Sequence, residues 1–258
     1  MRTSKLLVSL GLSVFALGAV LLSPHSASAG ATRAAVLASG TYDITDGRNA
    51  DGSSYQGLVQ VAQTGSVVHL RWDLGGVKNT HQGVGLLDGN RLAVAWTASP
   101  SGGVVIYKVH GGTLNGRWAS YGSTSEAVEN LKGPGGLNGD YRITLGTNEA
   151  GGHYTGRVHI APQGASHALT WDLDSGEHYT GVGVLSGDLL TVGWGAGSGA
   201  VVYDIRGDRL NGRWASPGDT KLGKEELKLK ARPKAKAPKQ PRKQPAPRQK
   251  LEPPRQRS

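Results

Sequence analysis

The sequence contains no cysteine, and this absence excludes several ways of stabilising or anchoring a protein. Without cysteine the chain has no disulfides and no thiolate ligands for a structural metal ion. A lipid anchor attached through an N-terminal cysteine is excluded as well. A folded domain in this chain must therefore be stable through its hydrophobic core alone.

Long apolar runs are also missing, except at the N-terminus, where residues 1–29 combine basic Arg2 and Lys5, the apolar segment LLVSLGLSVFALGAVLL and the small-residue ending SASA. This layout is typical of a secretory signal peptide. A retained membrane anchor is the weaker alternative, because a spanning helix needs about 20 apolar residues. We therefore expect a mature chain that starts near Gly30, lacks an integral membrane span, and is secreted or resides in the periplasm or cell envelope.

Strong catalytic motifs are absent too. The sequence has no G-x-S-x-G motif, phosphate-binding glycine loop, HExxH motif or zinc-ligand spacing. The glycine-rich GAGSG at 195–199 is interpreted as a flexible hairpin between two strands. No nucleophile–base pair and no paired carboxylates recur in both copies of the repeat described below. We therefore expect a protein that is not an enzyme and that has no cofactor.

One weak candidate for a metal site is the stretch DLDSGEH, with the possible ligands Asp172, Asp174, Glu177 and His178. Oxygen ligands so close together are compatible with Ca²⁺. The matching stretch of the other repeat lacks two of the carboxylates. A polar hairpin tip without a metal is therefore the favoured interpretation.

What the sequence does contain is an internal duplication. LNGRWAS occurs at 114–120 and again at 210–216, and GTYDIT at 40–45 matches GDYRIT at 139–144. Repetition over such a length indicates duplicated architecture. We divide the chain into a signal peptide (1–29), a linker (30–39), β-repeat 1 (40–132), a linker (133–138), β-repeat 2 (139–228) and a Pro/Lys/Arg-rich tail (229–258).

Both repeats alternate apolar and polar residues with period two, as half-buried strands do. Such blocks predict eight short strands per repeat, the last being ENLK at 129–132 and EELK at 225–228. Glycines in the dipeptides at 88–89, 187–188 and 207–208 mark tight hairpins. A long meander hides its edges by closing. We predict an all-β protein of two tandem eight-stranded up-and-down antiparallel barrels, avidin- or lipocalin-like, one per repeat; a continuous sheet or sandwich is the alternative.

Inward positions of the predicted strands carry tryptophans and glycines among the usual aliphatic residues. The inward glycines are Gly57, Gly83, Gly85, Gly116, Gly156, Gly181, Gly183 and Gly212. The tryptophans are Trp72, Trp96 and Trp118 in the first repeat and Trp171, Trp194 and Trp214 in the second. Glycine inside a strand often marks a close approach. We therefore predict that the indoles form the structural core and that glycines give them clearance. A filled interior is favoured over an aromatic cavity, because eight strands enclose little more than side chains or one small ligand.

The order of motifs resembles exported bacterial tandem β-repeat proteins often labelled fibronectin-binding. The shared pattern is G-x-Y, Y-x-G-x-V, W, G-x-G, L-x-V-x-W, V-Y and L-x-G-x-W, and it covers residues 40–132 and 139–228. The resemblance implies a β-repeat fold, and the label implies an extracellular host-protein ligand.

Basic charge is concentrated near the C-terminus, where residues 228–258 hold 12 of the 29 Lys and Arg residues but one of the 19 acidic residues. A proline-rich polycation is expected to be disordered and to bind anionic polymers or surfaces through counterion release; a solubilising spacer is the alternative. The candidate polyanion-binding residues are Lys228, Lys230, Arg232, Lys234, Lys236, Lys239, Arg242, Lys243, Arg248 and Lys250.

Three functions remain open on this basis. The leading hypothesis is an exported, non-enzymatic binding protein, adhesin-like or matrix-binding, whose barrels present loops to an extracellular protein. The alternatives are a carrier that holds a small ligand inside its barrels and a structural protein of the envelope. A ligand in the interior predicts a cavity in each barrel, whereas binding at the surface predicts filled barrels.

Overall fold

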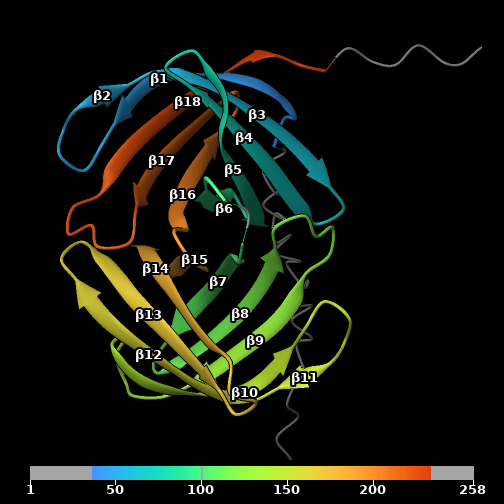
Figure 1. The fold of residues 1–258 in the computed structure, drawn as a ribbon, viewed down its shortest axis with the longest axis vertical. Helices are drawn as coiled ribbons and strands as arrows, with labels where there is room; N and C mark the ends of the chain where they lie inside the picture. The colour runs from blue at the N-terminus through green and yellow to red at the C-terminus, as the bar shows by residue number, and fades with distance from the viewer. Residues whose placement is uncertain (1–36, 100, 234–258) are drawn as a thin grey trace, which may run out of the picture. The chain divides into compact units, whose positions relative to one another are not determined.

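The computed structural model describes residues 37–99 and 101–233, and in these ranges all regular structure is β-strand (Figure 1). None of these residues belongs to a helix long and apolar enough to cross a membrane. The strands of the first repeat are β1 (Gly40–Arg48), β2 (Ser54–Tyr55), β3 (Gly57–Thr64), β4 (Val67–Leu74), β5 (Val77–Asp88), β6 (Arg91–Thr97), β7 (Gly103–His110), β8 (Thr113–Ser120) and β9 (Ala127–Lys132). Those of the second repeat are β10 (Gly139–Thr147), β11 (His153–Tyr154), β12 (Gly156–Gln163), β13 (Ser166–Leu173), β14 (His178–Ser186), β15 (Leu189–Trp194), β16 (Gly199–Arg206), β17 (Arg209–Ala215) and β18 (Gly223–Ala231).

These strands form two closed antiparallel barrels of eight strands each. The first barrel has the strand order β18-β17-β16-β6-β5-β4-β3-β1 and closes where β1 pairs with β18. The second barrel has the order β10-β12-β13-β14-β15-β7-β8-β9 and closes where β10 pairs with β9. The short strands β2 and β11 pair with β1 and β10 beside the barrels. The predicted all-β class with two eight-stranded antiparallel barrels is confirmed.

The assignment of strands to barrels differs from the prediction, because the two repeats exchange their last three strands. The first barrel combines β1 and β3–β6 of the first repeat with β16–β18 of the second, and the second barrel combines β7–β9 with β10 and β12–β15. Figure 1 shows the exchange by colour, since the blue and teal strands continue around one barrel into the orange strands β16–β18. The ranges 40–132 and 139–228 are therefore repeats in the sequence but not separate barrels, because each barrel contains strands from both ranges.

Two crossovers bring about this exchange. Strand β6 pairs with β16 instead of β7, and β15 pairs with β7 instead of β16. The crossovers touch at Gly102 and Gly195, where a Cβ would overlap the carbonyl oxygen of Trp194 or Ser101. Both glycines have positive φ, +99° and +102°, which disfavours any other residue. The segment 195–199, expected to form a hairpin, is thus a crossover between the barrels.

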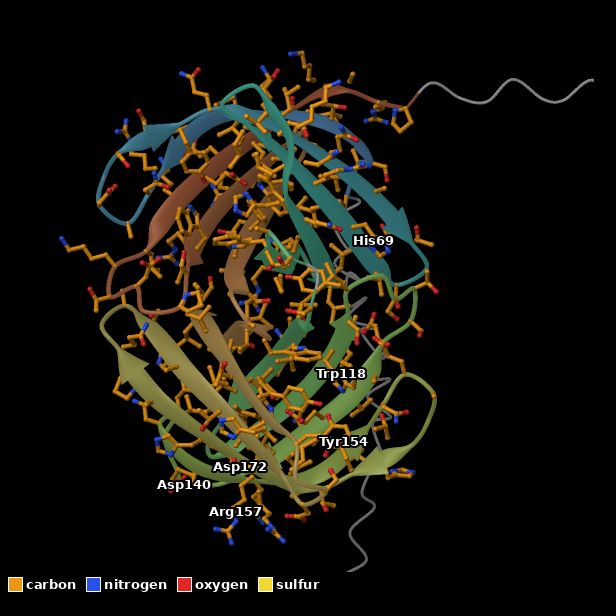
Figure 2. The ribbon with its side chains drawn as sticks, in the orientation of Figure 1. His69, Trp118, Asp140, Tyr154, Arg157 and Asp172 are labelled. Atoms are coloured by element: carbon orange, nitrogen blue, oxygen red, sulfur yellow. The ribbon has the colours of Figure 1, made fainter. Side chains whose placement is uncertain are left out.

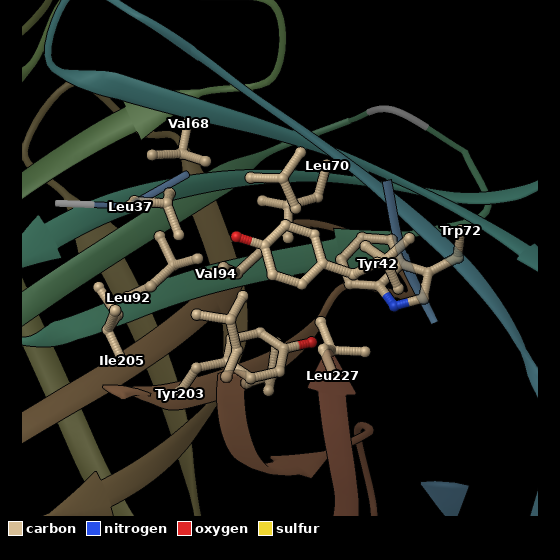
Figure 3. Packing of buried hydrophobic residues seen from close by; sticks show 14 of the residues in the cluster. Leu37, Tyr42, Val68, Leu70, Trp72, Leu92, Val94, Tyr203, Ile205 and Leu227 are labelled. Atoms are coloured by element: carbon tan, nitrogen blue, oxygen red, sulfur yellow. The ribbon is translucent and has the colours of Figure 1, made fainter. Parts of the chain in front are cut away.

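Apolar side chains form three clusters, one inside each barrel and one between the barrels. Figure 3 shows Tyr42, Leu70 and Trp72 of the first repeat packed with Tyr203 and Leu227 of the second inside the first barrel. The cluster between the barrels consists of residues that point outward from the central strands, among them Val84, Ala93, Ala95, Ile106, Val184, Leu189 and Val202. Both faces of β6 and β15 are therefore buried, which explains why these strands have few polar residues.

The predicted limits of the folded part need one adjustment at each end. Leu37, placed in the linker, is buried and belongs to the core of the first barrel. Strand β18 continues to Ala231, and Leu229 packs against the same core. The first three residues assigned to the tail therefore belong to the barrel.

Candidate functional site

Each barrel interior contains a cavity, of about 320 Å³ in the first barrel and about 390 Å³ in the second. Nine lining positions of the first cavity have a counterpart in the second, at offsets of 96–99 residues along the sequence. The matched pairs are Asn49/Asn148, Tyr55/Tyr154, Trp72/Trp171, Leu74/Leu173, His81/Tyr179, Trp96/Trp194, Val201/Val105, Trp214/Trp118 and Glu225/Glu129. The expectation of filled barrels is therefore corrected, because the interior residues leave an aromatic cavity in both.

All six tryptophans lie inside the barrels, three in each, as their inward positions predicted. Trp72 and Trp171 are buried, each with 5% of its surface exposed, and the other four are partly buried against the same cores. Figure 2 shows Trp118 and Tyr154 inside the second barrel, whereas Arg157 and Asp140 project from its outer surface. The indoles therefore surround the cavities and do not fill them completely.

In each cavity two of the indoles meet edge to face, an arrangement that aromatic pairs prefer. The ring centroids of Trp96 and Trp214 are 5.7 Å apart, and those of Trp118 and Trp194 are 5.9 Å apart. Both pairs join a strand of one repeat to a strand of the other. The wall of each cavity thus depends on the exchange of strands.

Glycines give the aromatic rings the predicted clearance, although not always at the predicted position. A Cβ at Gly83 would lie 2.7 Å from the Trp72 ring, as expected. The predicted Gly212, however, lies against the ring of Tyr203. The close neighbour of Trp96 is instead Gly199, at the start of β16, which the sequence pattern did not single out.

A buried glutamate lines each cavity. Glu225 in β18 and Glu129 in β9 each have 3% of their surface exposed. The Glu225 carboxylate accepts hydrogen bonds from Tyr55 Oη at 3.0 Å, from Trp72 Nε1 at 3.1 Å and from the Tyr203 hydroxyl. Two of these donors come from the first repeat, while Tyr203 and the glutamate come from the second.

Glu129 has the equivalent partners in the second barrel. Its carboxylate accepts hydrogen bonds from Tyr154 Oη at 2.9 Å, from Trp171 Nε1 at 3.0 Å and from the Tyr107 hydroxyl. Burial raises the pKa of both glutamates above the ordinary value of 4.5, because loss of water disfavours the charged form. The three hydrogen bonds to each carboxylate oppose this rise without cancelling it.

Sequence reasoning missed these glutamates, although the signal was present. In ENLK and EELK the glutamate that begins the motif lies two residues before a leucine, Leu131 or Leu227, which is inward-facing and fully buried. An acidic residue on the inward face of a strand, repeated in both copies, indicates a buried carboxylate. What the pattern could not give is the set of donors, because those lie on strands from both repeats.

The two cavities differ at a few positions. His81 lies 5.1 Å from the Trp96 ring in the first cavity, and Tyr179 lies 5.4 Å from the Trp194 ring in the second. Burial lowers the pKa of His81, which favours its neutral form. The second cavity is also lined by His153, Ser175 and Glu177, so it has a second carboxylate. The two barrels therefore present the same general site with different polar residues.

The weak metal candidate is not assembled into a site. His178 Nδ1 lies 2.7 Å from Asp172 Oδ1, and Asp174 Oδ2 accepts a hydrogen bond of 2.7 Å from Thr155. Glu177 lies among the residues of the second cavity. Within residues 37–99 and 101–233, no group of three or more His, Asp or Glu residues is arranged to hold a metal ion.

Of the candidate polyanion-binding residues, three lie in the described part of the chain. Lys228 and Lys230 belong to strand β18, and Lys230 Nζ forms an ion pair of 3.0 Å with Asp43. Arg232 follows the end of that strand. The candidates from Lys234 to Lys250 and the expected signal peptide lie outside the described residues.

Replacing both buried glutamates by glutamine should change how the stability of the protein depends on pH. Because the pKa of each carboxyl is raised on folding, its contribution to stability is complete below the ordinary value of 4.5 and is lost as the pH rises through the folded-state pKa. The Tm of wild type should therefore fall relative to that of Glu129→Gln/Glu225→Gln as the pH rises above the ordinary value of 4.5 and through the raised folded-state pKa. Melting curves with a constant Tm difference across that range would contradict the prediction.

Comparison of the chain with family models, with curated proteins and with solved structures finds no match.

Proposed function

We propose that this protein binds small ligands, with one site inside each barrel. The observation that carries the proposal is the presence of two equivalent cavities with nine matched lining positions. Their volumes of about 320 and 390 Å³ lie in the range of sites for small molecules. A mainly aromatic lining with a few convergent polar groups is also typical of such sites.

Neither the unfilled interior nor the buried carboxyl group of each barrel stabilises the fold. An unfilled interior gives up dispersion contacts and apolar burial, and a buried carboxyl group pays a desolvation cost that hydrogen bonds only partly offset. The chain repeats both costs at equivalent positions in its two barrels. Features that reduce stability and gather in one cavity are characteristic of functional sites.

This proposal favours the carrier over the surface-binding protein that the sequence put first. Secretion, and the binding of anionic polymers by the basic tail, stay predictions from the sequence. They are compatible with a ligand-binding barrel, since neither requires the barrel interior. Binding of an extracellular host protein likewise stays an implication of the family resemblance.

Fluorescence titration with the neutral apolar dye N-phenyl-1-naphthylamine tests the proposal. We expect saturable quenching of the indole emission and two dye molecules per chain. Val201 and Val105 line the first and second cavity at equivalent positions, so Val201→Trp should reduce the stoichiometry to one and Val201→Trp/Val105→Trp should abolish binding. Absence of binding to wild type, or an unchanged stoichiometry in folded variants, would refute an interior site.

A further inference from the structure

The ionisable side chains that line the two cavities are acidic, apart from two histidines and the tyrosines. The first cavity contains one carboxylate, Glu225, and the second contains Glu129 and Glu177. Neither lining includes a lysine or arginine, and the histidines His81 and His153 are the only basic side chains among these residues. The cavities therefore contain acidic groups without a permanent positive partner.

Each buried carboxylate meets only neutral donors, two tyrosine hydroxyls and one indole N–H. A carboxylate has about four positions at which it can accept hydrogen bonds, so three donors leave capacity for another. Buried carboxylates in proteins are usually paired with a cation or metal. The countercharge for Glu225 and Glu129 is not supplied by any residue that lines the cavities.

The indoles around the same cavities also favour positive charge. The face of an aromatic ring carries negative electrostatic potential, and tryptophan attracts cations more strongly than tyrosine or phenylalanine does. Each cavity presents three indoles. An anionic ligand would face both this potential and the glutamate, whereas a neutral ligand would leave the carboxylate without a countercharge.

We infer that each cavity binds an organic cation, with its ammonium group at the buried glutamate and its apolar body among the indoles. This inference rests on the proposed function, because it assigns a ligand class to the same two cavities. The carboxylate would supply the countercharge and one or more hydrogen-bond acceptors, and the aromatic wall would supply apolar contact and cation–π attraction. The volume of each cavity restricts the ligand to a small amine.

Calorimetric titration of the full chain at pH 7 with three probes of the same shape tests this inference. The probes are 3-phenylpropan-1-amine, which is a cation, 3-phenylpropan-1-ol, which is neutral, and 3-phenylpropanoate, which is an anion. We expect the amine to bind about tenfold or more tightly than the alcohol, as a desolvated cation–π contact and a charged hydrogen bond imply, and the acid to bind most weakly. In Glu129→Gln/Glu177→Gln/Glu225→Gln, which removes every acidic residue of the two linings, the preference for the amine should disappear while binding of the alcohol persists.

The outcomes separate the two proposals. Equal or tighter binding of the alcohol or the acid by wild type would overturn the cation assignment and leave the interior site standing. Failure of all three probes to bind would overturn both. Retention of the amine preference in folded glutamine variants would show that the buried glutamates do not recognise the charge, and would also overturn the assignment.

A second pair of variants keeps the test decisive if the glutamine variants do not fold. Trp96 and Trp194 line the cavities and are only partly buried, so Trp96→Leu/Trp194→Leu should lower the amine-to-alcohol preference several-fold. Gln60→Leu, at an exposed position of β3, is the matched control and should leave the preference unchanged. An unaltered preference in the tryptophan variant would contradict the role of the indoles in binding the cation.

Discussion

Replacing Trp72 with alanine should lower the free energy of unfolding by about 3–5 kcal/mol, the usual cost of truncating a buried tryptophan. The side chain is only 5% exposed, belongs to the core of the first barrel and lies against Gly83. Its loss also removes the indole donor to Glu225. Trp171→Ala should have a similar effect, because Trp171 is equally buried and donates to Glu129.

Urea or thermal unfolding measures this loss of stability. A conservative variant separates the contribution of the apolar volume from that of the hydrogen bond. Trp72→Phe keeps most of the apolar volume and removes the hydrogen bond, so its cost should be nearer to about 1–3 kcal/mol, the cost of removing one partner from a buried polar group. A melting curve of Trp72→Ala identical to that of wild type would show that this indole is not part of the core.

The strands and hairpins were predictable because they depend on local sequence. Period-two alternation indicates a strand wherever it occurs, and it located every long strand of both barrels. The turn glycines Gly89, Gly187 and Gly207 have φ of +60°, +59° and +64°, as the hairpin dipeptides predicted. Closure into barrels followed from the same pattern, since a long meander otherwise exposes two edges.

The exchange between repeats was not predictable from that pattern, because the duplicated strands are nearly interchangeable. VVIYKV in β7 and AVVYDI in β16 offer the same alternation to β6, so local sequence does not specify which of them pairs with it. The continuous apolar stretch LAVA in β6, and LTVG in β15 with Thr191 as its one polar residue, were a sign that both faces of these strands are buried. Only the three-dimensional structure shows that the second face contacts the other barrel.

The candidate site was predictable in part. The inward tryptophans were identified from alternation, yet whether they fill a barrel or surround a cavity depends on distances that a sequence does not give. The hydrogen bonds to Glu225 join β2, β4, β16 and β18, which belong to two repeats. Because its residues come from both repeats, this site could not be predicted from either repeat alone.

Because the repeats exchange strands, an engineered disulfide should form at one pair of positions and fail to form at another. The chain has no native cysteine, so no other thiol competes in this test. Asp43 in β1 pairs with Lys228 in β18 where the first barrel closes. Opposite residues of antiparallel strands have Cα atoms about 4.5–5.5 Å apart, a separation that a disulfide can span. A barrel closed within one repeat would instead place Asp43 opposite Lys132, which in fact pairs with Arg142 of the second barrel.

The most direct test of the central claim, that each cavity is built from both repeats, is therefore to oxidise two double variants and count their free thiols after denaturation. Asp43→Cys/Lys228→Cys should lose both thiols in a monomeric product, and Asp43→Cys/Lys132→Cys should retain both. The reverse result, with a disulfide between positions 43 and 132 and none between 43 and 228, would contradict the exchange and the cavities that depend on it.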